Sequence, residues 1–282
     1  TMDCVVGIDI GTTSTIGILI ALPDQVLAQT TRPVIFSAPQ QGWAEENPEH
    51  WWDNTCSIIP ELITQAGIRA ANIKAVGVTG MLPALVLLDK NDAVLRPSIQ
   101  QSDGRSGAEV AELADEIDCA RFLTQAGNGV NQQLIATKLR WIEKHEPDVF
   151  AQIATVFGSY DFINWKLTGK KAVEQNWALE AGFTDLATHG LSDRLINLAH
   201  VSPAVIPPRV ASHEILGHIS QQAAMATGLP FGVPVVGGAA DHIASGFAAG
   251  IVNPGDVLLK FGGSTDILIA TKTAVPDARM FL

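Results

Sequence analysis

A carboxylate followed by a turn of glycine and hydroxyl residues lies near the start of the chain. Asp9 ends an apolar, strand-like run, and the turn that follows contains Gly11, Thr12, Thr13 and Ser14. Such a turn exposes backbone N–H groups and hydroxyls on one concave side, an arrangement that binds anions. Asp9 could hold Mg²⁺, or the water around it, between phosphates. From these residues alone, an ordinary polar hairpin explains the pattern equally well.

A second turn of the same kind lies near the end of the sequence. Two strand-like runs flank its residues, which are Gly262, Gly263, Ser264 and Thr265. By itself this turn is better interpreted as a plain connection between strands. Together the two turns indicate more, because two such hairpins on related domains can face each other across a triphosphate.

A third candidate is Asp241, which follows an apolar strand and the small residues 237–240. A carboxylate at a strand end, beside residues that permit close backbone approach, suits a general base that removes a proton from a hydroxyl. The alternative is that Asp241 is the N-cap of the next helix, which is a very common role. From the residues alone the cap is the better interpretation, and the two roles are compatible.

The polar run 100–105 combines amide, hydroxyl, carboxylate and guanidinium groups, among them Asp103 and Arg105. Such groups could recognise a polyhydroxylated ligand through directional hydrogen bonds. A solvated loop, with Asp103 or Ser106 capping the following helix, explains the run at least as well.

Two further groups of residues are interpreted as structural. Trp43, Trp51 and Trp52 could stack on a sugar ring, but they fit a hydrophobic core better. The run 138–141 is typical of a helix that passes from surface to core rather than of a functional site.

The elements that must position these residues alternate between strands and helices. Apolar runs at 3–10, 15–21 and 26–31 predict a meander of three consecutive strands. Asn47 and Pro48 predict the start of a long helix, as N-cap and first helical residue. Further runs predict strands at 74–79, 84–89, 154–157, 257–261 and 266–270, and helices at 108–118, 137–144, 161–167 and 242–249. The class is therefore α/β with a mixed sheet.

Composition and charge exclude several classes of function. The chain has 282 residues and a formal net charge of −11, which disfavours binding to nucleic acid. Charged and proline residues interrupt every apolar run before it reaches the ~20 residues that a membrane helix needs. The three cysteines show no zinc or disulfide spacing, so we expect a reducing, cytoplasmic location.

The chain resembles the FGGY carbohydrate kinases, and most closely their xylulokinase-like members. The resemblance extends over residues 5–270, and each motif alone is weak whereas the ordered set is specific. The motifs are GIDIGTTS at 7–14, GWAEENPEHWW at 42–52, VLLDKNDAVLRPSIQQSDGRS at 86–106, KLRWIEKH at 138–145, SYDFINWKLTG at 159–169 and GVPVVGGAADHIASG at 232–246.

This resemblance implies an actin-like (ribonuclease H-like) ATPase fold with ATP and Mg²⁺ in a cleft between two domains. Residues 1–232 would form the sugar-binding domain, and residues 233–282 the start of the nucleotide-binding domain. The proline-rich stretch 201–232 is typical of such a boundary.

The resemblance also assigns roles to individual residues, and it favours the base over the cap at Asp241. The implied roles are metal binding for Asp9, phosphate binding for the turns 11–14 and 262–265, substrate binding for Met81, Leu82, Asp103, Arg105 and Asp241, and general-base catalysis for Asp241.

The sequence departs from the family pattern at several of these places. Ile16 stands where many relatives have Lys or Arg, and Pro83 stands where xylulokinases have a histidine. Gln101 and Ser102 replace a Trp-Asn pair. The chain is also shorter than the family and lacks the stretch that would bind adenosine. The identity of the sugar is therefore left open.

We expect an ATP-dependent kinase that phosphorylates a hydroxyl of a small ketose or polyol, similar to xylulose or ribulose. Two alternatives stay open from the sequence: an actin-like chaperone or filament protein switched by nucleotide, and a non-catalytic sugar-binding homologue. The expected partner is a small sugar, without nucleic acid or membrane. A homodimer is compatible with the sequence, since dimers are the commonest assembly.

Overall fold

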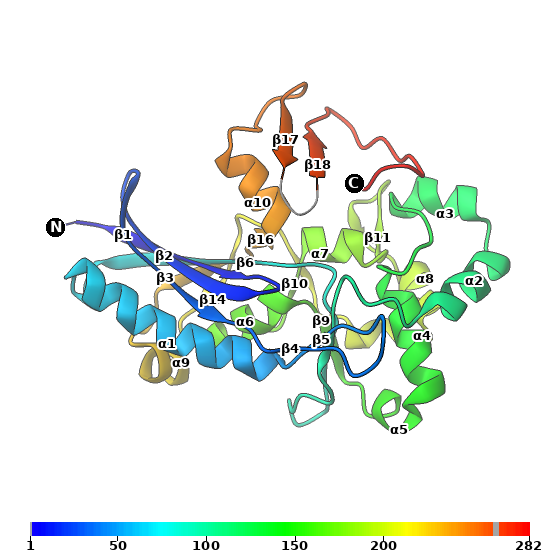
Figure 1. The fold of residues 1–282 in the computed structure, drawn as a ribbon, viewed down its shortest axis with the longest axis horizontal. Helices are drawn as coiled ribbons and strands as arrows, with labels where there is room; N and C mark the ends of the chain where they lie inside the picture. Colours follow the sequence, from blue (N-terminus) through cyan, green and yellow to red (C-terminus); the bar gives the residue numbers. More distant parts are fainter. Residues whose placement is uncertain (1, 262–264) are drawn as a thin grey trace.

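A mixed sheet of seven strands forms the centre of the protein (Figure 1). The computed structural model describes residues 2–261 and 265–282. The main strands lie in the order β14 (Ile215–His218), β15 (Pro234–Val236), β6 (Ile73–Gly80), β1 (Cys4–Ile10), β2 (Ser14–Ala21) and β3 (Gln25–Pro33). The seventh strand, β16 (Ala239–Ala240), pairs with the last residues of β6.

The first three strands form the antiparallel meander that the sequence predicts. Apolar residues alternate with smaller or polar ones along β1, so Val6, Ile8 and Ile10 are buried on one face. Ile10 pairs with Thr15, which leaves residues 11–14 as the turn between β1 and β2. The meander therefore places the candidate phosphate turn at one edge of the sheet.

Two helices pack on this sheet, and a third packs against both of them (Figure 1). The first two are α1 (Pro48–Ala66) and α6 (Ser159–Thr168), and the third is α9 (Gln221–Thr227). As predicted, Asn47 caps α1, since its side chain accepts a hydrogen bond from the Glu49 N–H at 3.0 Å. Helix α1 lies directly on β2 because Gly17 has no side chain: a Cβ there would be 2.2 Å from Ile58 Cγ2.

A second group of helices packs beside the sheet, at the right of Figure 1. It contains α2 (Gly107–Glu116), α3 (Cys119–Ala126), α4 (Ile135–His145), α5 (Pro147–Phe150) and α8 (Asp193–Ile196). Before residue 233, the described residues also form one small sheet of three strands and three strand pairs, all separate from the central sheet. They are β4 (Phe36–Ser37), β5 (Glu45–Glu46) and β8 (Ser98–Ile99); β7 (Val86–Leu88) and β9 (Thr155–Phe157); β10 (Val173–Glu174) and β13 (Arg209–Val210); and β11 (Thr184–Asp185) and β12 (Gly190–Leu191).

The last part of the chain forms a helix and a hairpin above the sheet in Figure 1. Helix α10 (Asp241–Ala248) is followed by the antiparallel strands β17 (Val257–Phe261) and β18 (Thr265–Ile269). Apolar side chains of this hairpin are 53–80% exposed, namely Val257, Leu259, Phe261, Ile267 and Ile269. Among the described residues, no helix combines the length and apolar character that crossing a bilayer requires.

Strands β15 and β16 belong to the central sheet, although both follow the domain boundary expected at residue 232. Each pairs in parallel with β6. The location of that boundary stays a prediction.

The connection between β15 and β16 depends on a glycine at position 238. Gly238 has a φ of +86°, and a Cβ there would lie 2.1 Å from the Val78 carbonyl oxygen. A side chain at this position would therefore separate this segment from β6.

We expect Gly238→Ala to lower the free energy of unfolding by about 2–5 kcal/mol, because backbone strain and overpacking add. Gly232→Ala is the matched control, since Gly232 has a similar φ of +84° but open space around its Cβ position. It should cost only the strain, about 1–2 kcal/mol. Urea denaturation of both variants measures the difference, and equal losses would contradict the close approach to Val78.

Candidate active site

Three parallel strands end side by side at Gly80, the last residue of β6. Ile10 of β1 pairs with Gly80 on one side, and Ala240 of β16 pairs with it on the other. Asp9 and Asp241 adjoin these paired residues in the sequence. The structure therefore brings the two acidic side chains to the same edge of the sheet. In open α/β sheets, ligands bind beyond the carboxyl ends of such strands.

Asp9 is half-buried at this edge and is held by its neighbour on β6. The Thr79 hydroxyl donates to Asp9 Oδ1 at 2.8 Å. Burial raises the pKa of the Asp9 carboxyl, the Thr79 hydrogen bond opposes this rise, and the charge of Asp241 adds to it. The two carboxylates therefore repel each other, and a cation between or beside them would relieve that repulsion.

The turn after β1 is tight and presents its backbone outward. The Gly11 N–H donates to the Ser14 carbonyl at 3.0 Å, and a Cβ on Gly11 would lie 2.8 Å from that oxygen. Thr12 and Thr13 are exposed, and their N–H groups make no hydrogen bond to any described residue. These two N–H groups are free to bind an oxyanion.

Hydrogen bonds from three directions fix the segment before Asp241. The Gly237 N–H donates to the Glu214 carbonyl at 2.9 Å, and the Asn164 amide donates to the Gly237 carbonyl at 2.9 Å. The Ala240 N–H donates to Asn176 Oδ1 at 3.2 Å. The carboxylate that follows is consequently presented by a rigid support.

Asp241 is the first residue of α10, and Ala240 occupies the N-cap position. Asp241 is therefore not the N-cap that the alternative interpretation made it, because the N-cap position lies one residue earlier. Its Oδ1 accepts a hydrogen bond from the His242 N–H at 2.6 Å, and its side chain is 44% exposed. The carboxylate is thus anchored at one oxygen and accessible to a ligand.

The second candidate phosphate turn is only partly within the described residues. Gly262, Gly263 and Ser264 lie outside them, and Thr265 begins β18 opposite Phe261. Phosphate binding by this turn stays a prediction.

Met81 and Leu82 follow β6 directly and are each only 2% exposed. The Met81 N–H donates to the Ile10 carbonyl at 3.0 Å, and its own carbonyl accepts from the Ser159 hydroxyl at 2.8 Å. Both side chains pack in the core. Their contact with a substrate stays a prediction.

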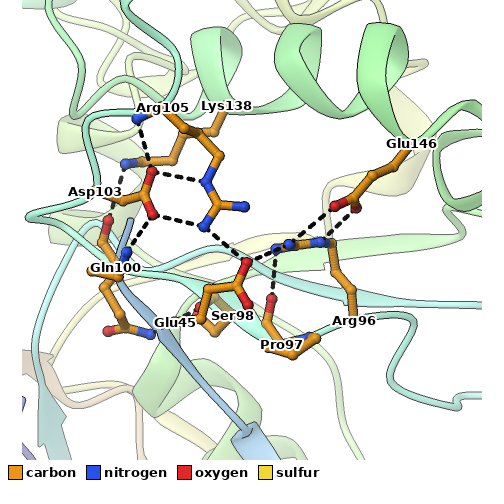
Figure 2. Close-up of polar contacts among 10 residues, drawn as sticks. Glu45, Arg96, Pro97, Ser98, Gln100, Asp103, Arg105, Lys138 and Glu146 are labelled. Atoms are coloured by element: carbon orange, nitrogen blue, oxygen red, sulfur yellow. Dashed lines mark hydrogen bonds and ion pairs between the residues drawn. The ribbon is translucent and has the colours of Figure 1, made fainter. Parts of the chain in front are cut away.

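Asp103 and Arg105 form a closed ion pair in a separate buried cluster, which Figure 2 shows. Asp103 Oδ1 accepts from the Arg105 N–H at 3.0 Å and from Arg105 Nε at 2.8 Å. Its Oδ2 accepts from the Ala44 N–H at 2.6 Å and from Arg105 Nη2 at 2.7 Å. Four donors fill the accepting capacity of the carboxylate. In this structure Asp103 holds its loop, and its predicted contact with a substrate stays a prediction.

The Arg105 guanidinium is fully buried between aromatic rings and a second carboxylate. Its central carbon lies 3.8 Å from the ring centre of Trp43 and 4.9 Å from that of Trp141. Arg105 Nη2 is also 2.8 Å from Glu45 Oε1, which pairs with Arg96 at 2.6 Å. Burial raises the pKa of Asp103, but the bonds from Arg105 and Ala44 outweigh burial and hold it below its usual value.

Lys138 on α4 completes this cluster and corrects one expectation. The run 138–141 was expected to pass from surface to core, but Lys138 is 0% exposed and Arg140 only 2%. The ammonium of Lys138 donates to the Gln100 carbonyl at 3.1 Å. Burial lowers its pKa to about 8, although the charge of Asp103 opposes this.

Most of the predicted site residues therefore form two groups. One contains Asp9, the turn 11–14 and Asp241 at the strand ends, and the other surrounds Asp103. No hydrogen bond or ion pair of the described residues joins these groups directly. The segment after Met81 connects them, because the Leu85 N–H donates to the Ile99 carbonyl at 3.0 Å.

The family model described as "FGGY family of carbohydrate kinases, N-terminal domain" matches residues 4–248. The chain belongs to this family. The xylulose kinases of Klebsiella pneumoniae and Escherichia coli K12 are similar, with 30% and 32% identity over 259 residues. Each alignment covers 92% of this chain and 53% or 52% of the relative. The chain thus spans about half the length of the curated relatives it matches.

Solved FGGY structures agree with this family. A xylulose kinase structure from Rhodospirillum rubrum has 57% identity and a TM-score of 0.96, over 99% of this chain and 57% of that one. A glycerol kinase from Plasmodium falciparum, solved with ADP, has 16% identity and a TM-score of 0.86, over 95% of this chain and 54% of that one. At that identity the second likeness concerns the fold alone. The fold is the α/β, actin-like ATPase fold of this family.

Two sets of residues at the sites of this FGGY chain could not be foreseen from the sequence. One contains Thr79, which donates to Asp9, and His242, which contacts Asp241 and is itself paired with Glu180. The other is the set Glu45, Arg96 and Lys138 around Arg105. For some of the charged residues the sequence signal is a charge beside apolar residues, as at Lys138 in a helix that also contains Leu139 and Trp141.

Stability should reveal the buried lysine through its dependence on pH. The pKa of Lys138 is about 8 when folded and 10.5 in its ordinary state, so the unfolded chain binds more protons between these values. The free energy of unfolding should therefore gain a rising contribution from about pH 8 to 10.5, at most about 3 kcal/mol. Lys138→Met should remove it, as measured by urea denaturation across this range.

Leu139→Met is the control for this measurement, because it alters the same helix without changing a titratable group. It should keep the pH dependence of the wild-type protein. An unchanged slope in Lys138→Met would show that Lys138 is not desolvated in the folded state.

Proposed function

We propose that the protein containing this chain transfers the γ-phosphate of ATP to a hydroxyl of a small ketose or polyol. The chain belongs to the FGGY family, and similar proteins are named xylulose kinases. The observation that carries the proposal is the shared edge at Gly80, where Asp9, the turn 11–14 and Asp241 lie together. Phosphoryl transfer requires carboxylates that hold a metal ion or accept a proton, and a turn that binds phosphate oxygens.

In this proposal the turn 11–14 binds phosphate oxygens of ATP through the free N–H groups of Thr12 and Thr13. The second turn, 262–265, would contribute in the same way. Only backbone groups and hydroxyls are needed, which agrees with the apolar Ile16 on the neighbouring strand.

The donor set at Asp9 fits magnesium. Mg²⁺ prefers oxygen ligands and is usually held by one or two carboxylates together with substrate phosphates. The half-buried Asp9 carboxylate offers such an oxygen, and Thr79 orients it at 2.8 Å. When bound, Mg²⁺ neutralises the negative charge of the phosphates.

Asp241 acts as the general base in this proposal. Its carboxylate accepts the proton of the sugar hydroxyl while the new bond forms between that oxygen and the γ-phosphorus. The bond from the γ-phosphorus to the bridging oxygen breaks, and ADP leaves. Anchoring of Oδ1 by the His242 N–H at 2.6 Å leaves Oδ2 to receive the proton.

The sugar would be recognised by the loop that the Asp103–Arg105 pair holds in place. In this loop Gln101 is half-buried and Ser102 is exposed, whereas Asp103 is fully buried. Gln101 and Ser102 are thus the polar side chains that can reach a ligand without breaking the cluster. Contact with Met81 and Leu82, a second copy as partner, and a cytoplasmic location stay predictions.

The test is a phosphorylation screen of the full-length protein with ketoses and polyols of three to seven carbons. We expect ADP release that depends on one of these compounds, with a phosphorylated product of matching mass. Asp241→Asn should lower kcat about 10²–10⁴-fold, because a general base usually contributes that much. Asp115→Asn is the control, since Asp115 is exposed on α2 and belongs to neither group of site residues.

Retained activity in Asp241→Asn, within about tenfold of wild type, would remove Asp241 from the base role. ATP hydrolysis that no sugar stimulates would instead favour a protein switched by nucleotide. Sugar binding in calorimetry, without any phosphorylated product, would identify a non-catalytic homologue.

A further inference from the structure

The ring of His242 lies between two carboxylates that come from different elements. Its Nε2 is 3.2 Å from Oε1 of Glu180, the last residue of α7 (Gln175–Glu180). Its Nδ1 is 3.5 Å from Oδ1 of Asp241. The His242 ring thus bridges Glu180 and the candidate base Asp241, and we call this arrangement the Glu180–His242–Asp241 bridge.

This arrangement favours an imidazolium, because a carboxylate faces each ring nitrogen and only the charged ring donates from both. Burial lowers the pKa of His242, but the hydrogen bonds and charges of Asp241 and Glu180 outweigh it and raise it to about 9. The side chain of Glu180 is 9% exposed, and His242 is its ion-pair partner among the described residues. A buried carboxylate of this kind needs a cation beside it.

The supporting helix contacts the polypeptide on both sides of Asp241. Asn176, one turn before Glu180 on α7, accepts from the Ala240 N–H at 3.2 Å. Glu180 holds the ring of His242. The like charge of Asp9 on β1 also acts on Asp241, since the charge of Asp241 raises the pKa of the Asp9 carboxyl. Helix α7 therefore determines the position of the base. The carboxylate of Asp241 interacts favourably with the charge of His242 and unfavourably with that of Asp9.

We propose that His242, held by Glu180, is a positioning residue that keeps the Asp241 carboxylate in one orientation, with Oδ2 turned to the substrate hydroxyl. The inference rests on the proposed function, since it deepens the role of Asp241. His242 takes no proton from the substrate. Its ring holds Oδ1 through a 3.5 Å ion pair, in addition to the backbone N–H bond to the same oxygen. Its charge also offsets the repulsion between Asp9 and Asp241, so that the base is oriented when the hydroxyl arrives.

Steady-state kinetics of the full-length protein test this role with His242→Gln and Glu180→Gln. We expect kcat to fall about 10–100-fold in His242→Gln and less in Glu180→Gln, because a misoriented base reacts slowly. The KM values for sugar and ATP should change little, since neither residue binds them. The matched controls are His200→Gln and Glu143→Gln, which alter an exposed His–Glu pair with a 2.6 Å contact and should retain wild-type kcat.

An NMR titration of the histidine rings provides a readout that does not depend on activity. In the wild-type protein we expect His242 to titrate at a pKa of about 9. In Glu180→Gln its pKa should move toward the ordinary value of 6.5, because one of the two carboxylates is lost. Circular dichroism establishes that each variant is folded.

The outcomes separate this role from the proposed function. An active wild-type protein whose kcat is unchanged in His242→Gln overturns the positioning role alone, as does a loss confined to KM. A His242 ring that titrates at its ordinary value in the wild type removes the bridge itself. A wild-type protein that phosphorylates no sugar, with the bridge intact in the titration, overturns the proposed function and the catalytic role of His242 together.

Discussion

The candidate site depends on a close approach between two stretches of backbone. The segment that leads to Asp241 passes so near the Val78 carbonyl that position 238 has no room for a side chain. This approach lets β16 pair with the end of β6, which already pairs with β1 on its other side. Asp241 and Asp9 lie at one edge for this reason, and the helix α7 then fixes the segment from outside.

The two groups of charged residues in this protein use electrostatics in opposite ways. Around Asp103 every oxygen of the carboxylate has a donor, and the aromatic rings of Trp43 and Trp141 exclude water from the Arg105 guanidinium. At the strand ends, Asp9 and Asp241 carry like charges that influence each other, and both retain accessible surface. A closed cluster contributes rigidity, whereas an incompletely compensated one contributes reactivity.

Much of the framework could be predicted from the sequence because its signals are local. Alternating apolar residues indicated the meander, and the Asn47–Pro48 pair indicated the start of α1. The FGGY motifs placed the chain in its family, as the family match confirms. Contacts between distant segments gave no such signal. A lysine on a helix normally predicts surface, and only tertiary packing places Lys138 beside Gln100. The Glu180–His242 pair joins α7 to α10 and was likewise invisible.

The closed pair of Asp103 and Arg105 lets different residues of one loop anchor its backbone and present side chains at its surface. Its backbone is held by Ala44, Gly42 and Lys138 from outside, through bonds that do not involve the side chains of Gln101 or Ser102. Those two positions can therefore exchange amide, hydroxyl or aromatic groups while the ion pairs below them stay intact. In the proposed kinase, this arrangement would let the sugar preference change without loss of the ion pairs that hold the loop.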